Sequence, residues 1–145
     1  MNAPELAVAA CHALDLTWIA AAPAERARHW QRIHGDAELA AWLAPLQHTH
    51  LYFGSEFCEH LLPSTRALRE ALRQAESAGL RLVLLTPVAS PEVLARLDAL
   101  LTMLPAGSEV VVNDWGVAHE LASRFPDLRP VAGRVLCRMT KDPRL

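Results

Sequence analysis

The sequence has no surplus of positive charge and no long apolar run, and these two absences exclude whole classes of function. It carries 14 Lys and Arg against 16 Asp and Glu, which gives a formal net charge of −2. A surface that binds nucleic acid or an anionic membrane normally shows as a basic excess, so no nucleic-acid partner is evident. No stretch approaches the roughly 18 consecutive apolar residues of a membrane-spanning helix, so we expect no membrane partner either.

Cysteine and targeting signals are also sparse. The three cysteines, Cys11, Cys58 and Cys137, are widely spaced and odd in number, which argues against a disulfide framework. The first residues include no basic segment and place Glu5 early, which is atypical of a secretory signal peptide. No glycine-rich loop of the P-loop or Rossmann type is present. The small, odd number of cysteines predicts a reduced, cytoplasmic setting.

What the chain does have is a regular alternation of strand and helix patterns. Its 145 residues are 52% hydrophobic and 21% charged, as expected of one globular domain rather than a disordered chain. Strands are predicted at 50–54, 81–87, 108–114 and 128–136, and helices at 64–80, 90–104 and 114–125. Strands that alternate with helices in this way form a parallel sheet with right-handed crossovers.

Helix starts are marked by residues that suit the first turn. Ser64, Ser90 and Asp114 each precede an apolar-periodic segment and are predicted to cap it, and Pro91 suits a first helical position. The first fifty residues are less regular. The segment 24–46 reads as helical with a break near Gly35, 16–23 is open to an opening strand, and 4–14 is open to either helix or strand.

Unusual polar residues follow the predicted strands rather than precede them. Glu56 and Cys58 follow the first of these strands, Asn113 and Asp114 end the third, and Arg134 lies in the fourth. The carboxyl ends of parallel strands converge on one face, where ligands bind. We therefore expect these five residues to form a ligand site, while noting that strand-to-helix loops also use Asp and Asn as caps and turns.

Other side chains offer alternatives. A zinc site could use a mixture of histidine and cysteine ligands, here His48, His50, Cys58 and His60. No His-x-x-x-His or Cys-x-x-Cys spacing is present, however, and histidines in loops are commonly solvated or packed instead. Glu56 and Glu59 form a candidate acid–base pair, although they are three positions apart and their side chains would point in different directions on a strand-to-loop turn. Cys58 is disfavoured as a nucleophile because the neighbouring acidic residues disfavour the negatively charged thiolate form. Trp115 is the aromatic residue best placed to contact a ligand.

The same strand ends carry a family resemblance. The segments LYFGSEFCE, LRLVLLTPVAS, SEVVVNDWGVAHELA and PVAGRVL resemble the first half of the U-32 peptidase-like family. The similarity is greatest to the branch that contains accessory proteins of oxygen-independent ubiquinone hydroxylation. It depends on a strand ending in Gly54–Cys58, on Asn113–Gly116 and on Ala132–Gly133, and it covers about residues 49–136.

The resemblance implies an α/β fold that is a partial TIM-like barrel of four or five parallel strands with outer helices. It divides the chain into a mostly helical region at 1–48, a half-barrel at 49–136 and a tail at 137–145. Family members include collagenase-type peptidases and proteins that assist hydroxylation of RNA or quinone precursors. A non-peptidase accessory or binding protein is the function it favours.

Several members of this family carry a four-cysteine iron–sulfur cluster, and Cys58 corresponds to its first cysteine in the quinone branch. Cys58 is therefore the implied metal ligand, although Cys11 and Cys137 match no other cluster position. A [4Fe–4S] cluster needs four thiolates, so another chain would have to complete it. A full barrel takes about 250 residues, which leaves three expectations open: a homo-oligomer or partner that supplies the other half-barrel, an enzyme assembled across such an oligomer, or a degenerate half-barrel that acts only in oligomerisation.

Overall fold

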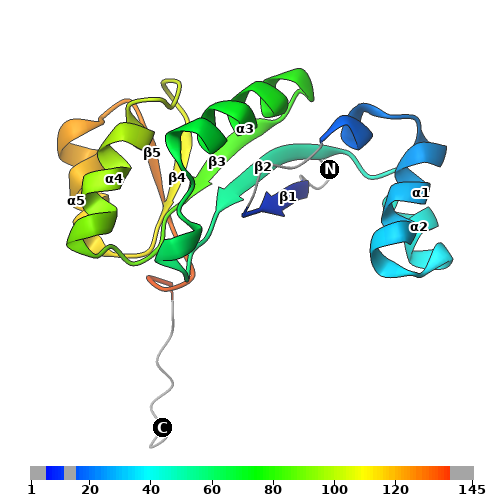
Figure 1. Ribbon diagram of the computed structural model, residues 1–145, viewed down its shortest axis with the longest axis horizontal. Helices are drawn as coiled ribbons and strands as arrows, with labels where there is room; N and C mark the ends of the chain where they lie inside the picture. The colour runs from blue at the N-terminus through cyan, green and yellow to red at the C-terminus, as the bar shows by residue number, and fades with distance from the viewer. Residues whose placement is uncertain (1–5, 12–15, 138–145) are drawn as a thin grey trace, which may run out of the picture.

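The computed structural model describes residues 6–11 and 16–137. They form one five-stranded parallel sheet with the strands in chain order, β1 to β5 (Figure 1). The strands are β1 (Leu6–Ala10), β2 (His48–Gly54), β3 (Arg81–Leu85), β4 (Glu109–Val112) and β5 (Arg129–Ala132). The helices are α1 (Pro23–His34), α2 (Ala37–Leu43), α3 (Thr65–Ser77), α4 (Pro91–Leu101) and α5 (Trp115–Arg124), with short 3-10 helices η1 (Thr17–Ala20) and η2 (Glu59–Leu61).

The prediction of an α/β fold that resembles part of a βα barrel is confirmed. Each strand pairs in parallel with the next one along the chain, with no reversal of strand order. Helices α3, α4 and α5 all contribute to one buried cluster against alternate strand residues. A sheet wound in one direction with its helices on one face is the arrangement of a (βα) barrel wall, whereas a doubly wound sheet has helices on both faces.

Strand β3 shows why the sequence has a continuous apolar run. Leu82 and Leu84 face the helices, and Val83 and Leu85 lie on the opposite face with Val111 of β4. Successive side chains of a strand alternate between faces, so a strand with two buried faces needs apolar residues throughout.

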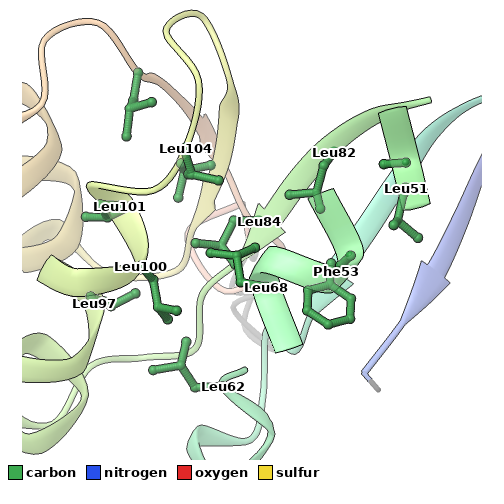
Figure 2. Packing of buried hydrophobic residues seen from close by; sticks show 14 of the residues in the cluster. Leu51, Phe53, Leu62, Leu68, Leu82, Leu84, Leu97, Leu100, Leu101 and Leu104 are labelled. Atoms are coloured by element: carbon green, nitrogen blue, oxygen red, sulfur yellow. The ribbon is translucent and has the colours of Figure 1, made fainter. Parts of the chain in front are cut away.

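The core between helices and sheet is built mainly from leucine. Figure 2 shows Leu68 of α3 beside Leu84 of β3, with Leu97, Leu100 and Leu101 of α4 alongside. Leu68 and Leu84 have no exposed surface. Truncation of such a residue to alanine typically costs about 2–5 kcal/mol of stability, because it leaves a cavity in a close-packed interior.

Three predicted helix starts are confirmed. The Ser64 hydroxyl accepts a hydrogen bond from the Ala67 N–H (3.1 Å), and the Ser90 hydroxyl accepts one from the Val93 N–H (3.3 Å). Asp114 caps α5 in the same way. Pro91 occupies the start of α4, where its missing N–H removes no hydrogen bond.

The first fifty residues differ in part from the sequence-based expectation. The segment open to either state contains β1, which pairs with β2. The opening strand considered for 16–23 is wrong, since Thr17–Ala20 forms η1. Leu16 and Ile19 are both buried, and a helical turn brings residues three apart to one side. The predicted break near Gly35 is confirmed, because this residue ends α1 with φ of 70°.

The strand predicted over 128–136 is shorter than expected. Strand β5 ends at Ala132, and Arg134 and Val135 lie in a turn. Their backbone N–H groups donate to side chains of Glu56 and Asn113 instead of to a neighbouring strand. Most of the tail predicted at 137–145 lies outside the described residues. In the described part of the chain, the helices are all too short or too polar to cross a membrane.

Candidate functional site at the carboxyl ends of the strands

The five predicted site residues all lie at the carboxyl end of the sheet. Glu56 and Cys58 are in the loop after β2, Asn113 and Asp114 follow β4, and Arg134 follows β5. Figure 1 shows the loop after β2 and the turn after β5 meeting at this end. The strand-end position inferred from the sequence is therefore where these residues are found, and their contacts decide what they do.

Glu56 and Arg134 join the loop after β2 to the turn after β5. The Glu56 carboxylate accepts a hydrogen bond of 2.9 Å from the Arg134 backbone N–H and another of 2.9 Å from the guanidinium Nε. The Glu56 side chain is only 10% exposed, whereas that of Arg134 is 72% exposed. The carboxylate is thus held inside, and the outer part of the guanidinium faces solvent.

The charge state of Glu56 follows from these contacts. Burial raises the pKa of the Glu56 carboxyl, but the hydrogen bonds from the Arg134 N–H and guanidinium and from Asn113 together outweigh burial and leave that pKa below its ordinary value. Glu56 is therefore a carboxylate held ionised by its neighbours. A general acid needs a raised pKa, so this environment suits structural pairing better than proton donation.

Asn113 is the most buried of the five residues, with 1% of its surface exposed. Its Nδ2 donates to the Thr86 carbonyl oxygen (2.8 Å), and its Oδ1 accepts from the Val135 N–H (3.0 Å). Asn113 thereby ties the ends of three strands together. Gly133 lies against it, since a Cβ at that position would overlap the Asn113 amide.

We refer to Glu56, Asn113 and Arg134 as the strand-end network. All three residues make hydrogen bonds to the turn after β5 or belong to it. Buried polar groups that satisfy one another hold the loops rigid. The network therefore shapes the surface above it, and only the outer side of Arg134 is open to a ligand.

Asp114 belongs to the same strand end but binds different groups. Its Oδ1 accepts from the Val117 N–H (2.9 Å), which caps α5, and its Oδ2 accepts from the Ala89 N–H (2.8 Å). Both carboxylate oxygens are thus engaged by backbone groups of two loops. The capping alternative considered from the sequence is the role that the structure supports.

Cys58 is half-buried at the start of η2, and its N–H donates to the Ser55 hydroxyl (3.2 Å). Within residues 6–11 and 16–137, no three His, Cys, Asp or Glu side chains lie close enough to hold a metal ion. This holds for the set His48, His50, Cys58 and His60 and for any set that contains Cys58. An iron–sulfur cluster does not fit the donors that the described chain brings together.

Four exposed apolar side chains lie at the same end of the sheet as the strand-end network, and we refer to them as the apolar rim. The loops after β2, β3 and β5 present Phe57, Val88 and Val135 respectively, and Trp115 is the first residue of α5, directly after the short loop that follows β4. Phe57 is 65% exposed and Trp115 is 78% exposed. Scattered apolar side chains are ordinary on a surface, but apolar residues that gather at one end mark an interaction site.

Of these four residues, the sequence alone indicates Trp115 as a ligand contact and gives no indication of Phe57, Val88 or Val135. Each of them lies in a loop beside polar or turn residues, so no local signal in the sequence distinguishes it. The guanidinium of Arg134 lies over the ring of Phe57, 4.6 Å from its centroid. This contact combines cation–π attraction with the salt bridge to Glu56 and fixes the outer face of Arg134 within the rim.

A separate cavity of about 470 Å³ lies at the opposite end of the sheet. Arg81, Glu109 and Arg129, the first residues of β3, β4 and β5, line it together with parts of α3. Ligands of parallel α/β sheets bind at the carboxyl ends, and the amino ends contribute mainly to stability. We therefore place the candidate site at the apolar rim.

Comparison of the chain with protein-family models, with curated proteins and with solved structures finds no match. The geometry of the rim and the strand-end network is therefore the basis for the function proposed below.

Proposed function

We propose that this protein is a cytoplasmic, U-32-peptidase-like accessory protein that binds an apolar aromatic ligand at the carboxyl ends of its strands. The observation that carries the proposal is the apolar rim, in which Phe57, Val88, Trp115 and Val135 are exposed at the same end of the sheet as Arg134, whose guanidinium lies over the Phe57 ring. Exposed apolar side chains that gather at one end of a fold, beside a fixed polar group, are typical of an interaction surface.

A prenylated phenol suits this combination. Its tail and ring are apolar, so Phe57 and Trp115 can cover them, and its ring oxygen is a hydrogen-bond acceptor for the Arg134 guanidinium. Such compounds belong to the class of quinone precursors, which is why we link the proposal to oxygen-independent ubiquinone biosynthesis. The role is binding and presentation, since Glu56, Asn113 and Asp114 already use their polar atoms to hold the loops.

The test is calorimetric titration with a geranyl-substituted phenol. The proposal predicts saturable binding that is weakened at least about tenfold, or 1.4 kcal/mol, by Trp115→Ala and by Phe57→Ala. Trp42→Ala is the matched control, because Trp42 is as exposed as Phe57 but lies in α2. No binding by the unaltered protein, or equal weakening by the control, would overturn the proposal.

A partner that completes the barrel is the alternative left open by the sequence, and strand β5 bears on it. The N–H groups of Arg129 and Gly133 donate to Ser108 and to Val112 of β4, so by alternation Pro130 faces the open edge. Proline has no N–H to offer to an added strand, and natural edge strands use it to prevent pairing. We therefore propose that association takes place elsewhere than at the β5 edge.

A further inference from the structure

The helical hairpin, α1 and α2 with the turn at Gly35, stands apart from the rest of the molecule. Figure 1 shows it at the far end from α4 and α5. Helix α1 contains no buried residue, and every residue from Gln31 to Leu39 is exposed. Ile33, Leu39 and Trp42 are three of the exposed large apolar side chains, with exposed fractions of 55%, 38% and 65%.

The base of the hairpin is anchored, so its exposed end is held in place. The Trp30 ring contacts that of Trp18 edge-to-face at 4.9 Å and lies 6.0 Å from the ring of His48 of β2. Arg26 donates to the Leu46 carbonyl oxygen (3.3 Å). Amphipathic helices normally pack their apolar face against the core of the protein. Packing within one copy therefore does not explain why this anchored helix pair exposes apolar side chains to solvent.

The two helices of the hairpin differ in net charge. Helix α1 carries Arg26, Arg28 and Arg32 against Glu25, which pairs with Arg28 (3.5 Å), whereas the only charges of α2 and its N-cap are those of Glu38 and Asp36. Asp36 is engaged, since it caps α2 (2.9 and 3.0 Å). Among the described residues, no side chain pairs with the Glu38 carboxylate, and Arg32 has only a 3.2 Å contact with the His29 ring.

We infer that two copies of this chain pair through their helical hairpins, with α1 of one copy against α2 of the other. A two-fold axis makes each contact twice, so a surface must be complementary to itself. Here α1 of one copy meets α2 of the other, which places Arg32 opposite the partner's Glu38. Ile33, Leu39 and Trp42 then lie between the copies in a four-helix arrangement.

The second copy is favoured over an unrelated protein by this division of charge. An unrelated partner would need its own pattern of charges to match Arg32 and Glu38. A second copy already carries the matching pattern, because each hairpin has one positive and one negative charge to pair with the opposite charge of the other. The helices have only 12 and 7 residues, so the interface is smaller than the roughly 800 Å² per partner of a standard complex. The dimer is therefore expected to dissociate on dilution.

Sedimentation velocity of the full chain across a range of concentrations tests the inference. The unaltered protein is expected to show a concentration-dependent monomer–dimer equilibrium. Trp42→Glu should weaken dimerisation at least about tenfold, because it places a charge among the apolar side chains. Phe57→Glu is the matched control, since Phe57 has the same exposed fraction of 65% but lies in the apolar rim. Circular dichroism of each variant checks that the fold is retained.

Charge exchange provides a second, independent test. Arg32→Glu and Glu38→Arg should each weaken the homodimer, because each places like charges opposite one another twice. A mixture of the two variants should form a heterodimer, and the double variant should form a homodimer again. A protein that remains monomeric at every concentration, a dimer indifferent to Trp42→Glu, or a mixture of variants that fails to associate would each overturn the inference. None of these outcomes depends on ligand binding at the apolar rim.

Discussion

Arg134 binds the carboxylate of Glu56 twice, through its backbone N–H and its guanidinium Nε, at 2.9 Å each. The two residues are 78 positions apart in the chain, and their contact joins the loop after β2 to the turn after β5. A carboxylate and a guanidinium at one end of a sheet suggest a ligand site when only the sequence is known. Since they are each other's partners, their first effect is on the rigidity of that end.

Replacement of Glu56 by glutamine should lower the free energy of unfolding by about 1–2 kcal/mol at neutral pH. Charge-assisted hydrogen bonds contribute about 1.5–3 kcal/mol, and the exposure of Arg134 reduces that value. The pKa of Glu56 is lower in the folded state than its ordinary 4.5. Its contribution is therefore present above that value and is lost as the pH falls through the folded-state pKa.

Urea denaturation of wild type and Glu56→Gln at a series of pH values measures this effect. The two curves of stability against pH should converge below the folded-state pKa of Glu56. A constant difference at every pH would show that ionisation of Glu56 does not stabilise the fold.

Asn113 and Gly133 should show strong coupling in a double-mutant cycle. Asn113→Ala leaves the Thr86 carbonyl and the Val135 N–H without partners and should cost about 1–3 kcal/mol. Gly133→Ala places a Cβ only 2.6 Å from Asn113 Cγ and should cost about 1–3 kcal/mol by overpacking. In the double variant the Asn113 side chain is gone, so Gly133→Ala should add little. Additive costs would contradict the contact.

Substitution of Asp114 should lower the free energy of unfolding more than substitution of Cys58. Asp114→Ala removes a helix cap and a hydrogen bond to Ala89 and should cost about 1–2 kcal/mol. Cys58→Ser changes a half-buried thiol to a hydroxyl and should cost less than about 0.5 kcal/mol. Thermal denaturation of the two variants decides the matter. A larger loss for Cys58→Ser would mean that its thiol has a structural role.

His48 should make the stability of the protein depend on pH in mildly acidic solution. Burial, assisted by the neighbouring Arg26, lowers the pKa of His48 below its ordinary 6.5. A lowered pKa means that the unfolded chain binds the proton more tightly, so stability is full above 6.5 and falls as the pH drops through the folded-state pKa. The Trp18 and Trp30 rings contact His48, which places the protonated ring in an apolar setting.

His48→Phe should keep these ring contacts and remove the titration. The variant is expected to lose less stability than wild type between about pH 7 and pH 5. His60→Gln, at an exposed position in η2, is the control and should behave as wild type. Identical pH profiles for wild type and His48→Phe would show that the lost stability arises from another group.

The sequence was sufficient for most of the sheet and its outer helices. The apolar run of β3, the caps Ser64 and Ser90 and the glycine that ends α1 each act through local physical rules, so they can be identified without the fold. The opening strand at 16–23 was wrong, because burial of Leu16 and Ile19 against the sheet decided in favour of a helical turn. Tertiary packing of this kind leaves no local signal.

The candidate site was predictable in position but not in chemistry. Parallel topology alone places Glu56, Asn113 and Arg134 at one end of the sheet. Whether their polar atoms face a ligand or one another depends on how the fold positions side chains that are as many as 78 residues apart in the chain, as Glu56 and Arg134 are. The apolar rim was missed for a related reason. Phe57 and Val88 are unremarkable in their own loops, and only the fold shows that the loops lie together.

The central claim is that the apolar rim at the carboxyl ends of the strands is the binding surface. Two-dimensional ¹H–¹⁵N NMR of the labelled protein, titrated with a geranyl-substituted phenol, tests it most directly. We expect shifts to concentrate on the amides of residues 55–58, 88–89, 114–116 and 133–136 and on the Trp115 indole N–H. Shifts centred on the helical hairpin or on the cavity at the amino ends of the strands, or no shifts at saturating ligand, would contradict it.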